Sequence, residues 1–251
     1  MWDKPQLMTA VSDLLLVSAA AVLFGALVVW AAHLPVFPLR EVIVMQELRE
    51  VRRSEVEQSL SDRLRGNFFS INLDGVRRSL EQLPWIRHVD IRRRWPSSLE
   101  VSIEEHVPAA FWGQSTGQLV NSYGEVFAAE MNASPTAPIP LLVGPSGWAP
   151  EMLTYYREAA EMLKPLGRVP QELNVSPRLA MQLRLDDGMI VELGRQQAKA
   201  PLRERLERFV EYYPSVLTAA LQRPKVVDMR YPNGFALRVA AAPAIENKGK
   251  P

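Results

Sequence analysis

The sequence predicts an α+β protein with one N-terminal transmembrane helix, a small helix-and-strand domain, and a mostly antiparallel β domain with flanking helices. Three observations carry this prediction. An uncharged apolar run extends from Leu14 to Ala32. Residues 37–107 show helical spacing of apolar residues and then strand alternation, and residues 108–240 read as short strands separated by turns.

Composition excludes several classes of function. The formal net charge is only +1, so no global field attracts nucleic acid. The chain has no cysteine, which excludes disulfides and thiolate catalysis. Its three histidines, His33, His88 and His106, lack ligand spacing, so we expect neither a metal nor a cofactor. Partners must then be recognised by local shape and pairing.

We assign residues 14–34 to the transmembrane helix and residues 1–13 to a short tail. The apolar run matches the roughly 20 residues that a helix needs to cross a bilayer. Trp30 suits an interfacial anchor, and Pro35 and Pro38 stop the helix soon afterwards. The alternatives are a buried core helix and a cleaved signal peptide, which would have a shorter apolar region and a small-residue cleavage site.

Charge gives weak information on the orientation of this helix. Lys4 precedes the span, whereas Arg40, Arg49, Arg52 and Arg53 follow it. The positive-inside rule alone would therefore place the N-terminus outside. Large folded domains translocate largely regardless of charge, so this bias does not decide the topology.

The first soluble region begins with a strand-like run, Leu39 to Met45, and two predicted helices follow. Ser54 opens the first helix and has capping-box spacing to Glu57. Pro84 ends the second. Both helices present an apolar stripe, formed by Val56, Leu60 and Leu64 and then by Leu73, Val76, Leu80 and Leu83.

Two strands joined by a turn at Pro96-Ser97-Ser98 complete this region. Alternation places one set of residues of the first strand on a common face: Trp85, Val89, Ile91 and Trp95. In the second strand, Leu99, Val101 and Ile103 face inward. The order strand, helix, helix, strand, strand predicts a small sheet covered on one face by two helices.

The triplet Arg92-Arg93-Arg94 raises the hypothesis of a nucleic-acid site. Arg92 and Arg94 are predicted to face Glu100 and Glu104 across the hairpin as exposed ion pairs. That face has no interleaved aromatic residues on which bases could stack. We therefore expect no nucleic-acid partner.

The second soluble region reads as strands, turns and two helices. We predict a hairpin around Ser122-Tyr123-Gly124, an irregular stretch from Ser134 to Pro150, and a helix over residues 151–163. Strands 179–185 and 189–193 meet at the turn Asp186-Asp187-Gly188. The last predicted elements are a helix from Pro201, strands 225–230 and 235–239, and a disordered tail over residues 241–251.

One motif suggests catalysis. Residues 113–117, G-Q-S-T-G, fit the spacing of a hydrolase nucleophile elbow around Ser115. Such an elbow needs a helix after the serine, but a strand pattern follows here, and all three histidines precede Ser115. Alternation also places Glu104 and Glu105 on opposite strand faces, so they form no catalytic pair. We expect no enzymatic activity.

Two sets of sequence runs together resemble a known family. Behind the single span stand L-P-W at 83–85, R-R-W-P at 93–96 and E-E-H-V-P-A-A-F-W at 104–112. The second set is LDDGMIVELGR from Leu185, LERFVEYYP from Leu206 and VVDMRYPNGFALRV from Val226. The first set resembles the βααββ POTRA domain, and the second the β domain, of the FtsQ/DivIB family of bacterial cell-division proteins.

This resemblance implies a non-enzymatic divisome scaffold in the inner membrane at the division septum, with a cytoplasmic N-terminus and periplasmic domains. It implies binding of FtsB and FtsL through the last strand, which would add a partner strand to a sheet edge. It also implies contacts with FtsK and other septal proteins through the POTRA domain and the membrane helix. Carried onto this sequence, the partner-binding residues are Arg178, Arg230, Tyr231, Gly234, Phe235, Leu237 and Val239.

Alternative readings stay open at this point. Tyr231 and Phe235 could instead pack the last hairpin onto its own core. The chain could also be a POTRA-bearing adaptor of a secretion or barrel-assembly machine, although such proteins usually string several POTRA units before a long barrel. A membrane-tethered serine hydrolase using Ser115 is the third reading.

Overall fold

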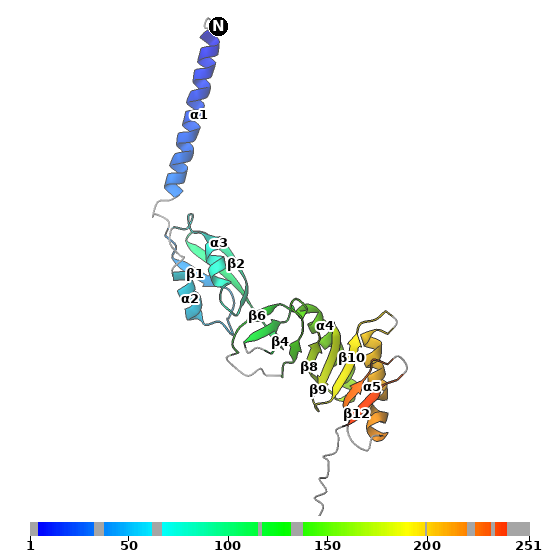
Figure 1. Ribbon diagram of the computed structural model, residues 1–251. Helices are drawn as coiled ribbons and strands as arrows, with labels where there is room; N and C mark the ends of the chain where they lie inside the picture. The colour runs from blue at the N-terminus through cyan, green and yellow to red at the C-terminus, as the bar shows by residue number, and fades with distance from the viewer. Residues whose placement is uncertain are drawn as a thin grey trace, which may run out of the picture. The chain divides into compact units, whose positions relative to one another are not determined.

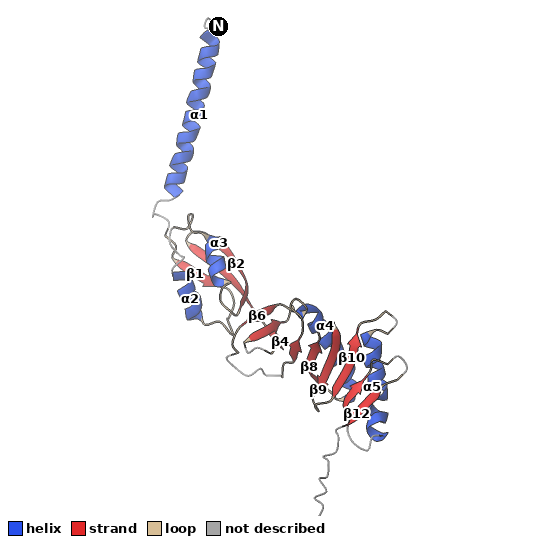
Figure 2. Cartoon of the chain, in the orientation of Figure 1, coloured by secondary structure: helices blue, strands red, loops and turns tan. Residues whose placement is uncertain are grey.

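The computed structural model describes residues 5–32, 38–61, 67–114, 117–131, 138–198, 200–219, 224–231 and 234–239. The chain divides into two compact units, Met1–His106 and Val107–Pro251. Figure 1 traces the chain from the N-terminal helix through both units, and Figure 2 shows helices and strands in each. The structure is thus α+β with one N-terminal apolar helix, as the sequence predicted.

Helix α1, Pro5–Ala32, is long enough to cross a membrane. Its segment Met8–Trp30 has a mean hydropathy of 2.2, and none of it is buried against the rest of the chain. At 1.5 Å per residue this segment is about 35 Å long, which exceeds the roughly 30 Å of a hydrocarbon core. The helix begins before the apolar run and includes Asp13. The predicted end at Leu34 lies outside the described residues.

The N-terminal unit has the predicted order of elements: β1 (Glu41–Val44), α2 (Arg53–Ser61), α3 (Leu73–Leu80), β2 (Ile86–Arg94) and β3 (Ser98–Glu105). The sheet order is β1-β3-β2, with β1 parallel and β2 antiparallel to β3. The predicted stripes are buried at Val56, Leu60, Val76 and Leu80, and the predicted strand face at Val89, Ile91, Leu99, Val101 and Ile103. Apolar burial between the two helices and one face of the sheet therefore builds this core.

The start of α2 differs from the prediction. The helix begins at Arg53, and the Glu57 carboxylate accepts a hydrogen bond from the Arg53 guanidinium at 3.1 Å. Glu57 thus makes an exposed i,i+4 ion pair in place of the capping box expected with Ser54. Leu64, the last predicted member of the stripe, lies outside the described residues.

The arginine triplet is only partly as predicted. Arg92 lies opposite Glu100, but its guanidinium pairs with Asp90 on its own strand at 2.8 Å. Arg94 lies opposite Ser98 and not opposite the second predicted glutamate. The reason is the register: in an antiparallel hairpin, each step of one residue toward the turn on the first strand is matched by a step of one residue toward the turn on the second. Once Arg92 opposes Glu100, Arg94 must oppose Ser98.

Trp95 is the clearest correction in this unit. The sequence placed it on the buried face, but its side chain is 80% exposed because β2 ends at Arg94 and Trp95 enters the turn. Arg93 connects the end of β2 to the loop before α3. Its guanidinium donates to the carbonyl oxygens of Phe68 and Ile71, both at 2.9 Å.

Glu105, at the end of β3, ties the loop before α2 to the sheet. Its carboxylate accepts three backbone N–H groups, from Arg49 at 2.9 Å, Glu50 at 3.0 Å and Val51 at 2.9 Å. Its neighbour Glu104 instead pairs with the Arg87 guanidinium at 3.0 Å. The two carboxylates therefore have separate partners.

The C-terminal unit contains nine strands and two α-helices within the described residues: β4 (Pro108–Trp112), β5 (Gln118–Asn121), β6 (Val126–Ala128), β7 (Leu141–Val143), α4 (Ala149–Leu163), η1 (Lys164–Leu166), β8 (Pro170–Val175), β9 (Ala180–Leu185), β10 (Ile190–Arg195), α5 (Leu202–Ala219), β11 (Pro224–Asp228) and β12 (Ala236–Val239). The nine strands form one sheet in the order β12-β11-β10-β9-β8-β7-β4-β5-β6. Five of its strand pairs are antiparallel and three are parallel. The prediction of a mostly antiparallel domain is confirmed.

Helices α4 and α5 contact each other and pack on the sheet, α4 against β7 and β8 and α5 against β10. Between helices and sheet lies a core whose fully buried members include Leu142, Met152, Leu163, Leu183, Leu185 and Met229. Predicted apolar positions of α5, Leu202, Leu206, Phe209 and Tyr213, are all buried. The helix continues through Pro214 to Ala219, beyond the segment that the sequence predicted.

Three strands of this unit were missed: β4, β7 and β8. β7 lies within the stretch predicted to be irregular, and α4 also begins there, at Ala149. β7 has only three residues and pairs in parallel with β4 on one side and β8 on the other. Parallel pairing joins residues that are distant in sequence, so short turn signals give no indication of β7. The other two missed strands, β4 and β8, also pair antiparallel with the strands that follow them, β5 and β9, so this reason applies to β7 alone.

Removal of the Glu105 carboxylate should destabilise the N-terminal unit. We expect Glu105→Ala to lower the free energy of unfolding by about 2 kcal/mol, because three backbone donors lose a charged acceptor. Glu104→Ala is the matched control, and loss of its more exposed ion pair should change stability by less than about 1 kcal/mol. Urea unfolding followed by tryptophan fluorescence compares the two. Equal effects would show that Glu105 does not hold the loop.

Candidate partner-binding edge

β12 forms one edge of the nine-stranded sheet. Among the described strands it pairs with β11 alone, and all four of its residues are exposed. Leu237 is 41% exposed and Val239 is 48% exposed. An edge strand presents backbone N–H and C=O groups on its outer side, where a further strand can pair. The sequence-predicted residues Leu237 and Val239 thus lie on an accessible edge.

The register brings the other predicted residues to one end of the sheet. β11 runs parallel to β10, with Asp228 opposite Glu192. β10 runs antiparallel to β9, with Arg195 opposite Ala180. The residues that follow β11 and those that precede β9 therefore share an end. Adjacent strands are about 4.8 Å apart, so β9 and β11 lie roughly 10 Å apart across β10.

Arg230 occupies this end and is held by acids on two strands. Its guanidinium donates to Asp228 at 2.8 Å from Nε and 2.5 Å from Nη2, and Nη2 lies 3.2 Å from the Glu192 carboxylate. The backbone N–H of Arg230 also donates to Asp228, at 3.0 Å. These hydrogen bonds from Arg230 lower the pKa of Asp228, against the opposing effect of burial. Arg230 is therefore a rigid, half-exposed cation.

Gly194 permits this arrangement. It lies at a register shift in β10 with φ +76°, a backbone conformation that favours glycine. A Cβ at this position would lie 2.9 Å from Cγ of Arg230. Buried Arg205 of α5 donates to the carbonyl oxygens on either side of the glycine, those of Leu193 at 2.5 Å and Arg195 at 3.1 Å. Helix α5 thereby stabilises the bulge.

Phe235 and Tyr231 behave differently. Phe235 is partly buried against the core, and its ring centroid lies 6.2 Å from that of Tyr212. Tyr231 is 55% exposed, and its carbonyl oxygen accepts a hydrogen bond from Arg208 at 3.0 Å. The alternative packing role thus fits Phe235, whereas the ring of Tyr231 is free to meet a partner.

Arg178 and Gly234 complete the predicted set. Arg178 is exposed in the turn between β8 and β9, which closes through a hydrogen bond from the Leu179 N–H to the Ser176 carbonyl at 2.8 Å. Leu179 has φ +60°, so this turn has a defined left-handed residue. Gly234 lies just before β12 and has open space where a side chain would stand. The predicted residues thus divide between the edge strand and one end of the sheet.

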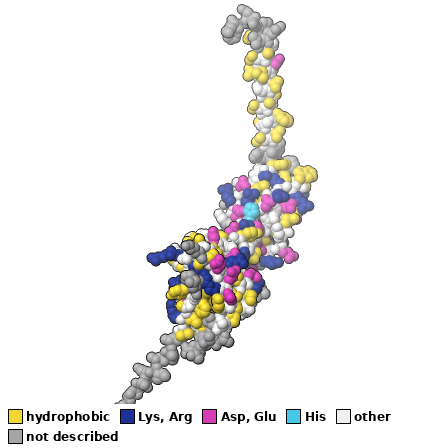
Figure 3. Space-filling model, turned by 90° about the vertical axis from the view of Figure 1, so that its right-hand side faces the viewer, with side chains coloured by type: hydrophobic (Ala, Val, Ile, Leu, Met, Phe, Trp, Pro, Cys, Tyr) yellow, Lys and Arg dark blue, Asp and Glu magenta, His cyan; other side chains and the backbone are white. Residues whose placement is uncertain are grey.

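A shallow groove extends the edge onto α5. Its lining combines acidic side chains with an arginine and aromatic rings: Glu204, Glu207, Arg208, Glu211, Tyr212, Gly234 and Phe235. Figure 3 shows hydrophobic side chains exposed in the lower part of the C-terminal unit, beside acidic and basic ones. Aromatic and arginine side chains are enriched at protein interfaces, so Tyr212, Phe235 and Arg208 are the members of this lining that suit one.

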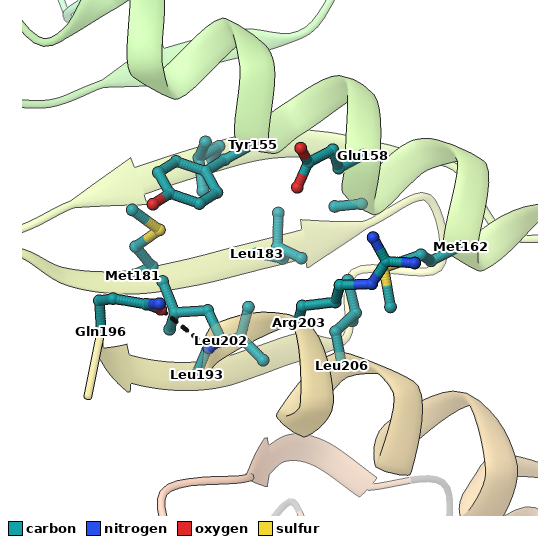
Figure 4. A pocket seen from close by; sticks show the side chains of 12 residues that line it. Tyr155, Glu158, Met162, Met181, Leu183, Leu193, Gln196, Leu202, Arg203 and Leu206 are labelled. Carbon is teal, nitrogen blue, oxygen red and sulfur yellow. Dashed lines mark hydrogen bonds between the residues drawn. The ribbon is translucent and has the colours of Figure 1, made fainter. Parts of the chain in front are cut away.

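A second cavity of about 190 Å³ lies between α4, α5 and the sheet. Figure 4 shows Tyr155, Glu158 and Met162 reaching it from α4, with Leu202, Arg203 and Leu206 on α5 opposite. Its lining is largely apolar, and the Arg203 guanidinium is paired with Glu207 at 2.9 Å. The lining residues hold no nucleophile beside a base, so this cavity has no hydrolytic arrangement.

The hydrolase motif and metal binding have little structural support in the described part of the chain. Ser115 lies outside the described residues, but β5, a strand, follows it where a nucleophile elbow would need a helix. Within the described ranges, no group of three or more His, Asp or Glu side chains is placed to hold a metal ion.

Sequence reasoning missed the residues that support the predicted ones. Asp228 precedes Arg230 by two positions, and residues two apart in an extended chain share a face, so their pairing had a readable signal. Glu192, Gly194 and Arg208 had none. Each reaches the site through strand pairing or helix packing between distant segments.

Comparison with known proteins agrees with this architecture. Residues 37–106 match the family model "POTRA domain, FtsQ-type", and residues 110–230 match "Cell division protein FtsQ/DivIB, C-terminal". The chain is 39% identical to the cell division protein FtsQ of Nitrosospira multiformis over 95% of this chain and 99% of that protein. It is 37% identical to FtsQ of Burkholderia pseudomallei, over 96% and 95% of the two chains.

FtsQ of Escherichia coli is 31% identical to this chain, and the match covers 87% of this chain and 79% of the E. coli protein. The two family models match the two soluble units. The N-terminal apolar helix that precedes them is consistent with a single-pass anchor. This chain belongs to the FtsQ/DivIB family of bacterial cell-division proteins.

Proposed function

We propose that this chain is a non-enzymatic divisome scaffold that binds a complex of FtsB and FtsL by adding a partner strand to β12, and so supports septum formation. The observation that carries the proposal is the position of β12, an exposed strand at the end of the sheet order. In this mode of recognition the main chain supplies affinity and alternate side chains supply selectivity.

The side chains of β12 fit this role. Leu237 and Val239 are two residues apart and share a strand face, where they offer apolar contact to the added strand. Arg238 points to the other face and offers a cation. The strand has only four residues, so a partner must gain further contacts beyond it.

The end of the sheet supplies those further contacts. Arg178 and Arg230 are cations roughly 10 Å apart by strand spacing, and they suit acidic side chains on the partner. Tyr231 adds an exposed ring beside them. Arginine and tyrosine are enriched among residues that dominate interface energies. In this proposal Gly234 leaves room for the partner backbone, and Phe235 packs against the core just before β12 and so holds that strand in place.

The remaining features of the proposal concern location. The family supports division-protein partners in general, and α1 is consistent with a single-pass anchor. We propose an inner-membrane location at the septum, with a cytoplasmic N-terminus and periplasmic domains. FtsK and other septal proteins would bind through the POTRA domain, residues 37–107, and the membrane helix. Residues 108–240 would form the β domain and residues 241–251 a tail.

A charge placed on β12 tests the edge. We expect Leu237→Asp in the full chain to weaken binding of the soluble FtsB–FtsL segments by at least about tenfold, which corresponds to roughly 1.4 kcal/mol. Val126→Asp is the matched control, because Val126 is 43% exposed on β6, the opposite edge of the same sheet. Calorimetric titration measures both. Binding unchanged by Leu237→Asp would remove β12 from the interface.

The Arg230–Asp228 pair makes stability depend on pH. Arg230 holds the pKa of Asp228 below its unfolded value of about 3.9, so the pair stabilises the fold above that pH and the effect is lost on acidification through the lower folded pKa. Arg230→Ala should lower the free energy of unfolding by about 1 kcal/mol at neutral pH, since the Arg230 side chain is 56% exposed although that of Asp228 is only 8% exposed.

The difference between the wild type and Arg230→Ala should shrink below about pH 4, where the carboxyl is increasingly protonated. Urea unfolding at neutral and acidic pH measures it. Arg230→Lys keeps the charge without the two-pronged geometry and should give an intermediate loss. A difference independent of pH would mean that Arg230 stabilises the fold through packing alone.

A further inference from the structure

Two exposed aromatic side chains stand at one end of the N-terminal unit. Trp95, in the turn after β2, is 80% exposed, and Phe69, in the loop before α3, is 47% exposed. The Phe69 ring is fixed edge-on against buried Phe68, with centroids 5.2 Å apart. Large apolar groups held at the surface in this way often mark an interaction site.

Arg93 brings the two loops together. It precedes Trp95 by two residues, and its guanidinium donates to the carbonyl oxygens of Phe68, Phe69 and Ile71 at 2.9, 3.3 and 2.9 Å. The turn and the loop are therefore joined by three hydrogen bonds. We call the surface formed by Phe69 and Trp95 the aromatic tip.

The chain arriving from α1 enters this unit at the same end. Pro38 forms a β-bridge with Asn67, immediately before the two phenylalanines. The Arg40 N–H donates to the Ser97 carbonyl at 2.9 Å, in the turn that contains Trp95. Both loops of the aromatic tip thus flank the entry point.

The length of the connection limits how far the tip can stand from the membrane. Ala32, the last residue of α1, and Pro38 are six residues apart, so even a fully extended chain spans only about 20 Å between them. The headgroup region adds several ångströms to each side of the hydrocarbon core. The other end of β2, at Ile86, lies about 26 Å further along the strand. The aromatic tip is therefore the end of the unit to which the chain from α1 is attached.

We propose that Trp95 and Phe69 insert into the headgroup layer of the membrane that α1 crosses, and so give the POTRA unit a second membrane contact beside its covalent link. Trp is enriched at membrane interfaces, where its ring meets both apolar and polar surroundings. Arg40 and Arg94, both exposed, flank the tip and suit lipid phosphates, with Glu41 as the acidic neighbour on β1. The inference rests on α1 as a membrane span and does not depend on which partner binds β12.

Spin labels measure the depth of the tip. The chain has no cysteine, so Ser97→Cys in the turn gives a unique labelling site in the full chain. The protein is reconstituted into vesicles of phosphatidylethanolamine and phosphatidylglycerol. Relaxation by oxygen, which partitions into lipid, is then compared with relaxation by a water-soluble nickel complex. A label at Phe24→Cys in α1 reports whether the anchor spans the bilayer, and one at Gln82→Cys, exposed beside the far end of β2, reports the aqueous reference.

We expect the label at position 97 to be protected from nickel at interfacial depth, and the label at position 82 to be fully accessible. Trp95→Ala with Phe69→Ala should return position 97 to aqueous accessibility, whereas Tyr123→Ala, which removes an equally exposed aromatic ring from the other unit, should not. Equal nickel accessibility at positions 97 and 82 overturns the proposal when position 24 is buried in lipid. An accessible position 24 overturns it by removing the anchor, and leaves the binding test on β12 unaffected.

Discussion

Two arginines, Arg205 and Arg230, contact the backbone at Gly194 in β10, where the C-terminal sheet continues to β11. The strand β10 has a register shift at Gly194, and buried Arg205 of α5 donates to the carbonyl oxygens of Leu193 and Arg195 on either side of it. Two residues after the end of β11, Arg230 bridges Asp228 and Glu192, two acids that would otherwise repel each other across the β10–β11 pair. Any side chain at position 194 would collide with Arg230. Gly194 thus leaves room for the arginine that joins β10 to the residue after the end of β11.

The two edges of the sheet have features that limit unwanted strand pairing. β6 and β12 have three and four residues, and short edges limit unwanted strand pairing. Arg238 on β12 adds a charge that opposes association with a second copy. In the proposed binding mode, an edge protected in this way needs additional side chains, and the cations and the tyrosine at the end of the sheet are proposed to supply them.

Local signals accounted for most of the fold. The Asp186-Asp187-Gly188 turn, the stripe Leu202, Leu206, Phe209 and Tyr213, and the alternation from Leu99 to Ile103 depend on neighbours in sequence, and the structure has each of them. β7 was missed because its pairing partners are distant. Trp95 was misplaced because alternation does not show where a strand ends. The candidate residues came from family resemblance, and the supporting contacts of Arg230 came only from the fold.

The parallel pairing of β10 with β11, reached through α5, has a consequence for biogenesis. Ribosomes add residues from the N-terminus, so both α4 and α5 and most of the core residues beneath them are synthesised before Pro224 begins the final hairpin. A chain interrupted after α5 would keep much of its apolar core but lack β11 and β12 altogether. The order of strands thus makes the exposed edge β12 a mark of completed synthesis, since a truncated product that folds would not display it.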